Sequence, residues 1–165
     1  MVAKELLGKY LVRRIGKKET AFIIIETEAY DGSEDKASHA SRGKTMRNAP
    51  MFEDAGIFYI YLCYGTHWML NVVTGDKGYP AAVLIRGIDG IEGPARLTKN
   101  LSIDKSFNKK LAIPKDKLWF EDRGVKIDSH QIKKLPRVGV AYAGEKWAKK
   151  PWRFIYILDI CRKHG

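Results

Sequence analysis

The sequence is poor in cysteine and contains no long apolar run. Its two cysteines, Cys63 and Cys161, lie far apart without redox or metal-ligand spacing, which argues against a disulfide scaffold and a zinc site. No segment is long enough to span a membrane, and no signal-type segment opens the chain. We therefore expect an intracellular protein with no membrane partner, cytoplasmic in a prokaryote and nuclear in a eukaryote.

Metal-binding patterns are also missing. The four histidines are scattered, and only Asp35 and His39 have an i,i+4 spacing that could hold a metal on a helix. We expect no bound metal and no cofactor. The chain contains no internal repeat and no low-complexity tract.

Acidic residues are clearly outnumbered by basic ones. The chain has 30 Lys and Arg against 19 Asp and Glu, which gives a net charge of +11 at pH 7. This bias indicates an anionic partner, such as nucleic acid or a membrane surface. With 165 residues and 45% hydrophobic content, we expect residues 1–165 to form a single domain with a real core. The chain opens abruptly on a helical pattern, from which we expect a truncated N-terminus.

The most informative stretch is IIIETEAY at residues 23–30, where a strand pattern carries two carboxylates. Because side chains alternate along a strand, Glu26, Glu28 and Tyr30 share one face. Burying a carboxylate is costly unless it is paired or hydrogen-bonded. A glutamate directly after three isoleucines is therefore either an ion-paired structural residue or a working base, and the residues alone leave both interpretations open.

The remaining patterns predict mostly strands. We expect strands over residues 10–15, 21–30, 57–62, 67–73, 81–85, 118–120, 137–142 and 152–158. We expect helices over residues 2–7 and from Gly93-Pro94 onward, a basic connection over 104–117, and loops over 31–54 and 144–150. The fold class that follows is α+β, a single domain built on a curved, mostly antiparallel sheet with few helices.

Three features of this pattern invite functional interpretations. Tyr64 stands near the tip of a predicted hairpin, where it could insert between base pairs, although such a tyrosine more often packs on its own hairpin. Arg86 ends an apolar strand and needs a carboxylate partner, either Glu28 or Glu26. The polar loop 31–54 is equally well explained by phosphate binding and by simple solvation.

Several unusual strings, taken in order, resemble the alkyladenine (3-methyladenine) DNA glycosylase family. They span the chain from about residue 6 to residue 156 and are IIIETEAY, SRGKTMRN, IFYIYLCYGTHWMLNV, AAVLIR, EGPARL and RVGVAYAGEKWAKKPWRF. The resemblance implies a monomeric enzyme that flips damaged purines out of double-stranded DNA and hydrolyses the N-glycosidic bond without a metal or cofactor. It also implies that the hairpin protrudes and inserts into the DNA.

The resemblance further implies roles for individual residues. Glu28 would be the general base that activates a water, with Arg86 and the backbone carbonyl of Val138 holding that water. Tyr30 and Tyr61 would sandwich the flipped purine. His39 would contact the edge of the flipped base, and Asn71 would stand where the extra amino group of guanine would clash. Tyr64 would be the wedge that fills the gap left by the flipped nucleotide. The contacts to the DNA backbone or groove would come from Lys44, Thr45, Arg96 and Lys105.

The chemistry of damaged purines fits these roles. A base inside a duplex must be rotated into a pocket before it can react, and unstacking is least costly for a damaged base. Alkylated purines carry positive charge, so they should stack well on tyrosine rings. We expect Glu28 to be ionised at pH 7 because Arg86 favours the carboxylate.

Some residues depart from the family pattern, and two other functions would also explain parts of the sequence. His67 stands where some relatives carry an aromatic residue, and Lys44 replaces an arginine. A nucleic-acid-binding module without catalysis would explain the charge and the hairpin equally well, but it would need no base. A metal-dependent nuclease would use Glu26, Glu28 and Asp35.

Overall fold

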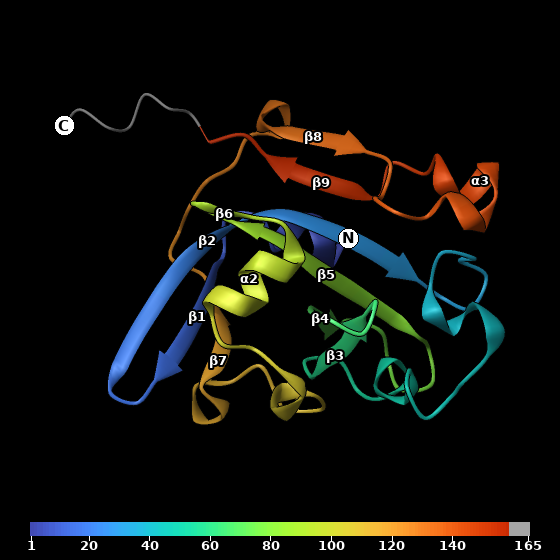
Figure 1. The fold of residues 1–165 in the computed structure, drawn as a ribbon. Coiled ribbons are helices and arrows are strands. Elements are labelled where there is room, and N and C mark those ends of the chain that lie inside the picture. The colour runs from blue at the N-terminus through green and yellow to red at the C-terminus, as the bar shows by residue number, and fades with distance from the viewer. Residues whose placement is uncertain (159–165) are drawn as a thin grey trace.

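Antiparallel strands make up most of the regular structure. The computed structural model describes residues 1–158, so Cys161 and His164 lie outside the described residues. The strands are β1 Tyr10–Ile15, β2 Lys18–Asp31, β3 Phe58–Cys63, β4 His67–Val73, β5 Ala81–Ile88, β6 Ile91–Glu92, β7 Leu118–Glu121, β8 Ile132–Leu135 and β9 Arg153–Tyr156. They form a curled sheet in the order β3-β4-β5-β2-β1-β7, with β6 beside β5 and β8 paired to β9 (Figure 1).

Strand β2 connects the two halves of this sheet. Its first half pairs with β1, and its second half runs between β5 and β9. The register against β5 shifts twice between Ile24 and Thr27, which is the signature of a β-bulge. Bulges bend a strand and change the direction of its side chains. Glu26 and Glu28 therefore lie at the place where the strand changes partners.

Short helices cover limited parts of the sheet. They are α1 Val2–Glu5, α2 Pro94–Asn100 and α3 Glu145–Ala148. Helix α2 begins at a proline, packs on β4 and β5, and buries Leu97 in the main core. In Figure 1 this helix lies across the front of the sheet, whereas α3 stands beside the ends of β8 and β9. None of the helices within residues 1–158 has the length and apolar character needed to cross a bilayer.

The predicted α+β class and the antiparallel sheet are confirmed, but one predicted strand is wrong. Residues 137–142 do not form a strand, because the strand of this region is β8 and a 3-10 turn follows over Ala141–Ala143. Gly139 has φ +72°, a conformation that extended chain does not use. The predicted loop 144–150 contains α3. The hairpin of β3 and β4 pairs in register from Phe58 with Val72 to Cys63 with His67.

Candidate active site

A single pocket of about 410 Å³ brings most of the predicted site residues together. Its volume lies within the range typical of small-molecule sites. The lining comes from β2, β3, β4 and β5, from the loop 37–47 and from the segment 138–142, with Met51, Tyr64 and Pro94 added from outside these elements. The predicted site residues that line this pocket are Glu28, Tyr30, His39, Tyr61, Tyr64, Asn71, Arg86 and Val138.

Glu28 lies at the floor of this pocket and is fully buried, with 0% of its surface exposed. Its Oε2 accepts a hydrogen bond of 2.8 Å from the Tyr30 hydroxyl, and its Oε1 accepts one of 2.8 Å from the backbone N–H of Val138. The Arg86 Nε lies 3.5 Å from the same Oε1. The carboxylate is therefore held in one orientation by three groups.

Burial dominates the ionisation of Glu28. Desolvation raises the pKa of Glu28 above its ordinary value, against the opposing effects of Arg86, the Val138 N–H and the Tyr30 hydroxyl. The sequence argument considered only the charge of Arg86, which lowers the pKa, and left out the larger effect of desolvation. That Glu28 is ionised at pH 7 stays a prediction. A carboxyl group with a raised pKa is a stronger base once it is ionised, which suits proton abstraction.

The neighbouring glutamate Glu26, also on β2, has a different environment. Glu26 Oε1 accepts hydrogen bonds from Arg86 Nε at 3.0 Å and from Arg153 Nε at 2.6 Å. Arg86 is therefore closer to Glu26 than to Glu28, although both carboxylates are within ion-pair distance. Glu26 fixes the guanidinium that faces Glu28. We call Glu26, Glu28, Arg86 and Arg153 the pocket floor. Glu28 and Arg86 line the pocket itself, whereas Glu26 and Arg153 support Arg86 and line a second hollow.

Aromatic rings form the walls above this floor. Tyr30 and Tyr61 both line the pocket, as predicted for a stacking pair, and Tyr59 packs beside Tyr61 with ring centroids 5.3 Å apart. Burial raises the pKa values of all three tyrosines, that of Tyr59 to about 12. All three hydroxyls therefore stay protonated at neutral pH and can act as hydrogen-bond donors.

His39 and Asn71 complete the lining close to Tyr59. The His39 Nδ1 lies 2.9 Å from the Tyr59 hydroxyl, and partial burial together with the charge of Arg47 lowers the pKa of His39. Asn71 is buried and donates from Nδ2 to the carbonyl oxygens of Tyr59 and Met69 at 3.1 and 3.4 Å. The histidine is therefore uncharged at pH 7, and the asparagine side chain is fixed by the hairpin backbone.

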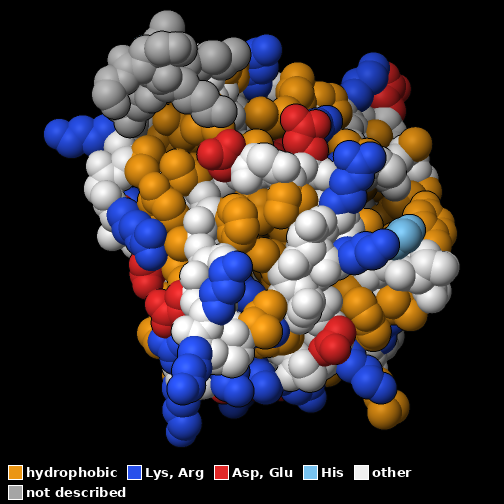
Figure 2. Space-filling model, turned by 60° about the vertical axis from the view of Figure 1, so that its left-hand side comes forward, with side chains coloured by type: hydrophobic (Ala, Val, Ile, Leu, Met, Phe, Trp, Pro, Cys, Tyr) orange, Lys and Arg blue, Asp and Glu red, His pale blue; other side chains and the backbone are white. Residues whose placement is uncertain are grey.

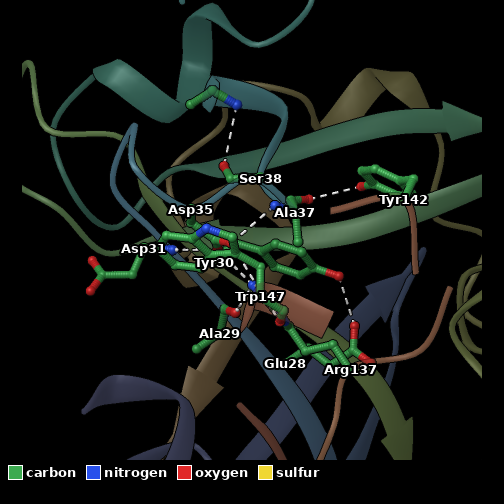
Figure 3. A network of polar contacts seen from close by, with 11 residues as sticks. Glu28, Ala29, Tyr30, Asp31, Asp35, Ala37, Ser38, Arg137, Tyr142 and Trp147 are labelled. Atoms are coloured by element: carbon green, nitrogen blue, oxygen red, sulfur yellow. Dashed lines mark hydrogen bonds and ion pairs between the residues drawn. The ribbon is translucent and has the colours of Figure 1, made fainter. Parts of the chain in front are cut away.

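A buried ion pair fastens the pocket loops to each other (Figure 3). Arg137 donates to both carboxylate oxygens of Asp35, at 2.5 and 2.8 Å, and to the Ala29 carbonyl at 2.9 Å. Both side chains of the pair are 0% exposed. We call Asp35 and Arg137 the clamp. Figure 3 also shows the Tyr142 hydroxyl directed at the Ala37 carbonyl, a hydrogen bond of 2.9 Å that ties the same two loops together.

The clamp also bears on the metal and nuclease hypotheses. Asp35 gives its carboxylate to Arg137, while His39 contacts Tyr59, so the two residues serve different partners. Within the described chain no group of three or more His, Cys, Asp or Glu side chains is arranged to hold a metal ion. Glu26 and Glu28 share Arg86, whereas Asp35 pairs with Arg137, so the three carboxylates are engaged by arginines and do not form one ligand set.

Two exposed tyrosines lie at the mouth of the pocket. Tyr64, at the tip of the hairpin of β3 and β4, is 92% exposed and has φ +50°. Tyr142 is 70% exposed on the other lining segment. The sequence prediction included Tyr64 but missed Tyr142, since nothing in the local pattern distinguishes it from a surface tyrosine.

The remaining predicted DNA contacts lie on the surface outside the pocket lining. Lys44, Thr45, Arg96 and Lys105 are all exposed. The Thr45 hydroxyl oxygen accepts a hydrogen bond from the backbone N–H of Asn48 in the loop before β3. Arg96 lies on α2 and lines a shallow second hollow together with Arg86 and Arg153. On the face drawn in Figure 2, Lys and Arg side chains are spread over the surface among apolar ones and do not gather in one patch.

Sequence reasoning missed three arginine contacts of the site. Arg47 was considered only as part of a polar loop, yet it lines the pocket, donates to the Leu62 carbonyl at 2.8 Å and lies 5.4 Å from the Tyr61 ring centroid. Arg153 and Arg137 were assigned to strands without a role. A buried basic residue in an apolar pattern is the signal that could have identified Arg137, because it requires a carboxylate partner.

Comparisons with known proteins identify the family of the chain. The profile of the family described as Methylpurine-DNA glycosylase (MPG) matches residues 1–92 and 88–158. A protein of Borreliella burgdorferi (strain ZS7) is 44% identical over 170 residues, covering 96% of this chain and 90% of its own length. One of Anaeromyxobacter sp. (strain Fw109-5) is 44% identical over 160 residues, with 93% and 81% covered. One of Methanocella arvoryzae is 42% identical over 176 residues, with 93% and 84% covered. All three carry the name "Putative 3-methyladenine DNA glycosylase".

Proposed function

The chain belongs to the methylpurine-DNA glycosylase family, and from this membership we propose that it is a monofunctional DNA repair glycosylase. It flips an alkylated or deaminated purine, of the 3-methyladenine, hypoxanthine and ethenoadenine class, out of double-stranded DNA. It then hydrolyses the N-glycosidic bond and leaves an abasic site. The observation that carries this proposal is the fully buried Glu28 at the floor of an aromatic pocket.

Glu28 is the general base in this mechanism. It takes a proton from a water whose oxygen attacks C1′ of the flipped nucleotide, and the bond from C1′ to the purine nitrogen breaks with its electron pair going to the base. Arg86 and the Val138 carbonyl orient the water. The raised pKa of Glu28 and the Arg86 contact at 3.5 Å support this role. Alkylated purines leave readily, whereas neutral lesions need an added proton on the base.

The walls and rim of the pocket select and hold the flipped purine. Tyr30 and Tyr61 stack on its two faces, His39 meets its edge, and Asn71 stands where the 2-amino group of guanine would clash. Tyr64 fills the space left in the duplex. Its 92% exposure at a hairpin tip supports insertion, because a side chain that packs on its own hairpin would be covered. The contacts to the DNA backbone come from the exposed residues Lys44, Thr45, Arg96 and Lys105, which are available to phosphates.

The two competing functions are less well supported. A binding module gains nothing from a buried carboxylate with a raised pKa, because that group costs stability and binds no DNA. A nuclease that uses Asp35 is disfavoured because Arg137 holds both oxygens of that carboxylate.

Excision assays test the proposed function directly. The wild-type protein is incubated with labelled duplexes that carry a single 3-methyladenine, hypoxanthine or ethenoadenine, with EDTA present. We expect release of the free base and a strand that stays intact until alkali cleaves the abasic site. An undamaged duplex of the same sequence is the control. Strand cleavage without alkali would indicate nuclease or lyase chemistry, and binding of the lesion without base release would indicate a binding module.

A further inference from the structure

An aromatic pocket that binds cations should carry negative charge, but the lining of the purine pocket carries little. The ionisable side chains of its lining, tyrosines and Cys63 aside, are one glutamate, two arginines and one histidine. Glu28 is already faced by Arg86, and His39 is uncharged at neutral pH. Arg47 adds a second positive charge beside Tyr61. The lining therefore offers a positively charged purine little net attraction.

Arg137 places a third guanidinium behind one wall, where Asp35 balances its charge. Its guanidinium carbon lies 4.8 Å from the centroid of the Tyr30 ring and 5.1 Å from that of Trp152. Tyr30 lines the pocket and Arg137 does not, so the ring stands between the guanidinium and the space for the purine. The side chain of Arg137 is 0% exposed, and the clamp fixes it in this position.

A cation behind an aromatic ring changes what the other face can bind. Attraction between a cation and a ring is electrostatic, and one guanidinium already occupies the field of Tyr30. Arg137 is the member of the clamp that lies against this ring, so a positively charged purine on the opposite face would meet the positive end of the ion pair. A neutral purine would keep its dispersion contacts with the ring. Arg47 near Tyr61 has the same effect on the other proposed wall.

We propose that Arg137 behind Tyr30 and Arg47 beside Tyr61 are specificity-determining residues, which make the pocket favour neutral damaged purines over positively charged ones. This inference rests on the proposed function, because it names the charge class of purine that the same pocket prefers. It reverses the expectation that bare tyrosine rings would favour alkylated cations. The preference is built from residues that do not contact the reacting atoms.

Binding to matched lesions tests this preference. The two duplexes carry 3-methyladenine, which is cationic in DNA, or 3-methyl-3-deazaadenine, its neutral isostere. Both nucleotides carry a 2′-fluoro sugar to suppress cleavage. The measured quantity is the ratio of the two Kd values within one protein, so changes in folding or in overall DNA affinity cancel. We expect the wild type to bind the neutral isostere more tightly, and tighter binding of the cationic lesion would overturn the proposal.

Neutralising each arginine should move this ratio. The variants are Arg47→Gln, and Asp35→Asn combined with Arg137→Gln, which removes both buried charges together because a lone one would destabilise the fold. We expect Arg47→Gln to shift the ratio toward the cationic lesion by about three- to tenfold. The double variant removes a charge-balanced pair, so it should shift the ratio in the same direction by a smaller factor. The control is Arg123→Gln, because Arg123 also pairs with a carboxylate and lies 4.5 Å from a tyrosine centroid, but on the sheet edge at β7 and β1. Its ratio should equal that of the wild type.

Failure of this inference can be separated from failure of the proposed function. A ratio that stays at the wild-type value in Arg47→Gln, or in the double variant when circular dichroism shows it folded, would overturn the inference while excision of lesions continued. Absence of both excision and lesion-specific binding in the wild type would instead overturn the proposed function. If the double variant does not fold, the wild-type ratio and Arg47→Gln still decide the result.

Discussion

Two fully buried carboxylates lie on either side of Tyr30 in the sequence, yet the clamp and the pocket floor use them differently. Asp35 receives two direct bonds from Arg137, and the pair is sealed from solvent. Glu28 shares its arginine with Glu26, its nearest Arg86 atom is 3.5 Å away, and it faces a pocket. The difference teaches that burial alone does not identify a catalytic acid or base. A carboxylate that is buried but incompletely paired is the better candidate.

Removing one partner of the clamp should have the largest effect. Asp35→Ala leaves Arg137 buried without its counter-charge, which typically costs about 3–5 kcal/mol of unfolding free energy. Urea denaturation measures this loss. The matched control is Glu19→Ala, which breaks the exposed pair with Arg14 and should cost no more than about 1 kcal/mol. Equal losses in the two variants would mean that the clamp is not a structural element.

On the pocket floor, the two arginines that share Glu26 should differ in their effect on excision. Arg86→Gln removes the positive charge beside Glu28, and we expect single-turnover excision to fall about 100-fold, as for the loss of one preorganised electrostatic contact. Arg153→Gln leaves Arg86 bound to Glu26 and should reduce the rate by only about two- to fivefold. If both variants lose activity equally, Arg86 acts through the structure of the floor and not through Glu28.

Tyr64, at the exposed rim of the pocket, should matter for DNA binding but not for the stability of the fold. Tyr64→Ser should weaken binding to a lesion duplex by about tenfold, because one stacked aromatic contributes roughly 1–3 kcal/mol. Its melting temperature should stay unchanged. The control is Ile15→Ser, an exposed apolar residue at the far end of β1. Unchanged lesion affinity in Tyr64→Ser would refute the wedge.

Neutralising Glu28 and neutralising Asp35 should change the melting temperature in opposite directions. The pKa of Glu28 is raised above 4.5 in the folded protein, so the wild type loses stability as pH rises from this ordinary value to the raised one. Glu28→Gln avoids that loss. Its melting temperature should therefore exceed that of the wild type at neutral pH, and the gain should shrink on acidification.

Asp35→Asn should lower the melting temperature at neutral pH, since it removes a charge that Arg137 needs. Melting curves between roughly pH 4 and pH 8 measure both effects. A lower melting temperature for Glu28→Gln at neutral pH would show that its carboxylate stabilises the fold, in which case the distinction drawn between Glu28 and Asp35 is incorrect.

The fold was largely predictable wherever one local pattern decides it. The alternation in β2, the turn at Tyr64-Gly65-Thr66 and the apolar β5 each predicted the element that the structure contains. The segment 137–142 misled the prediction, because Val138 and Val140 are strand formers. Its real conformation depends on the clamp and on Gly139, and neither can be seen from the segment itself.

The candidate site was predictable in its residue types but not in its electrostatics. Glu28 and Arg86 could be named because a charge after an apolar run needs an explanation. That Arg86 binds Glu26 more closely than Glu28 depends on the bulge in β2, and that Arg137 lies behind Tyr30 depends on a contact across more than 100 residues. Such distances in the chain carry no local signal.

Single-turnover excision by Glu28→Gln is the most direct test of the central claim, that Glu28 is the base. The substrate is a labelled duplex with one ethenoadenine or hypoxanthine, EDTA is present, and alkali-cleavable sites are scored beside the lesion-duplex Kd. The account predicts that excision is abolished while the Kd stays within about threefold of wild type. Gln keeps the shape of Glu28 and one oxygen that can accept from the Val138 N–H, and its amide N–H can donate to the Tyr30 hydroxyl oxygen. Substantial residual excision by Glu28→Gln would contradict it.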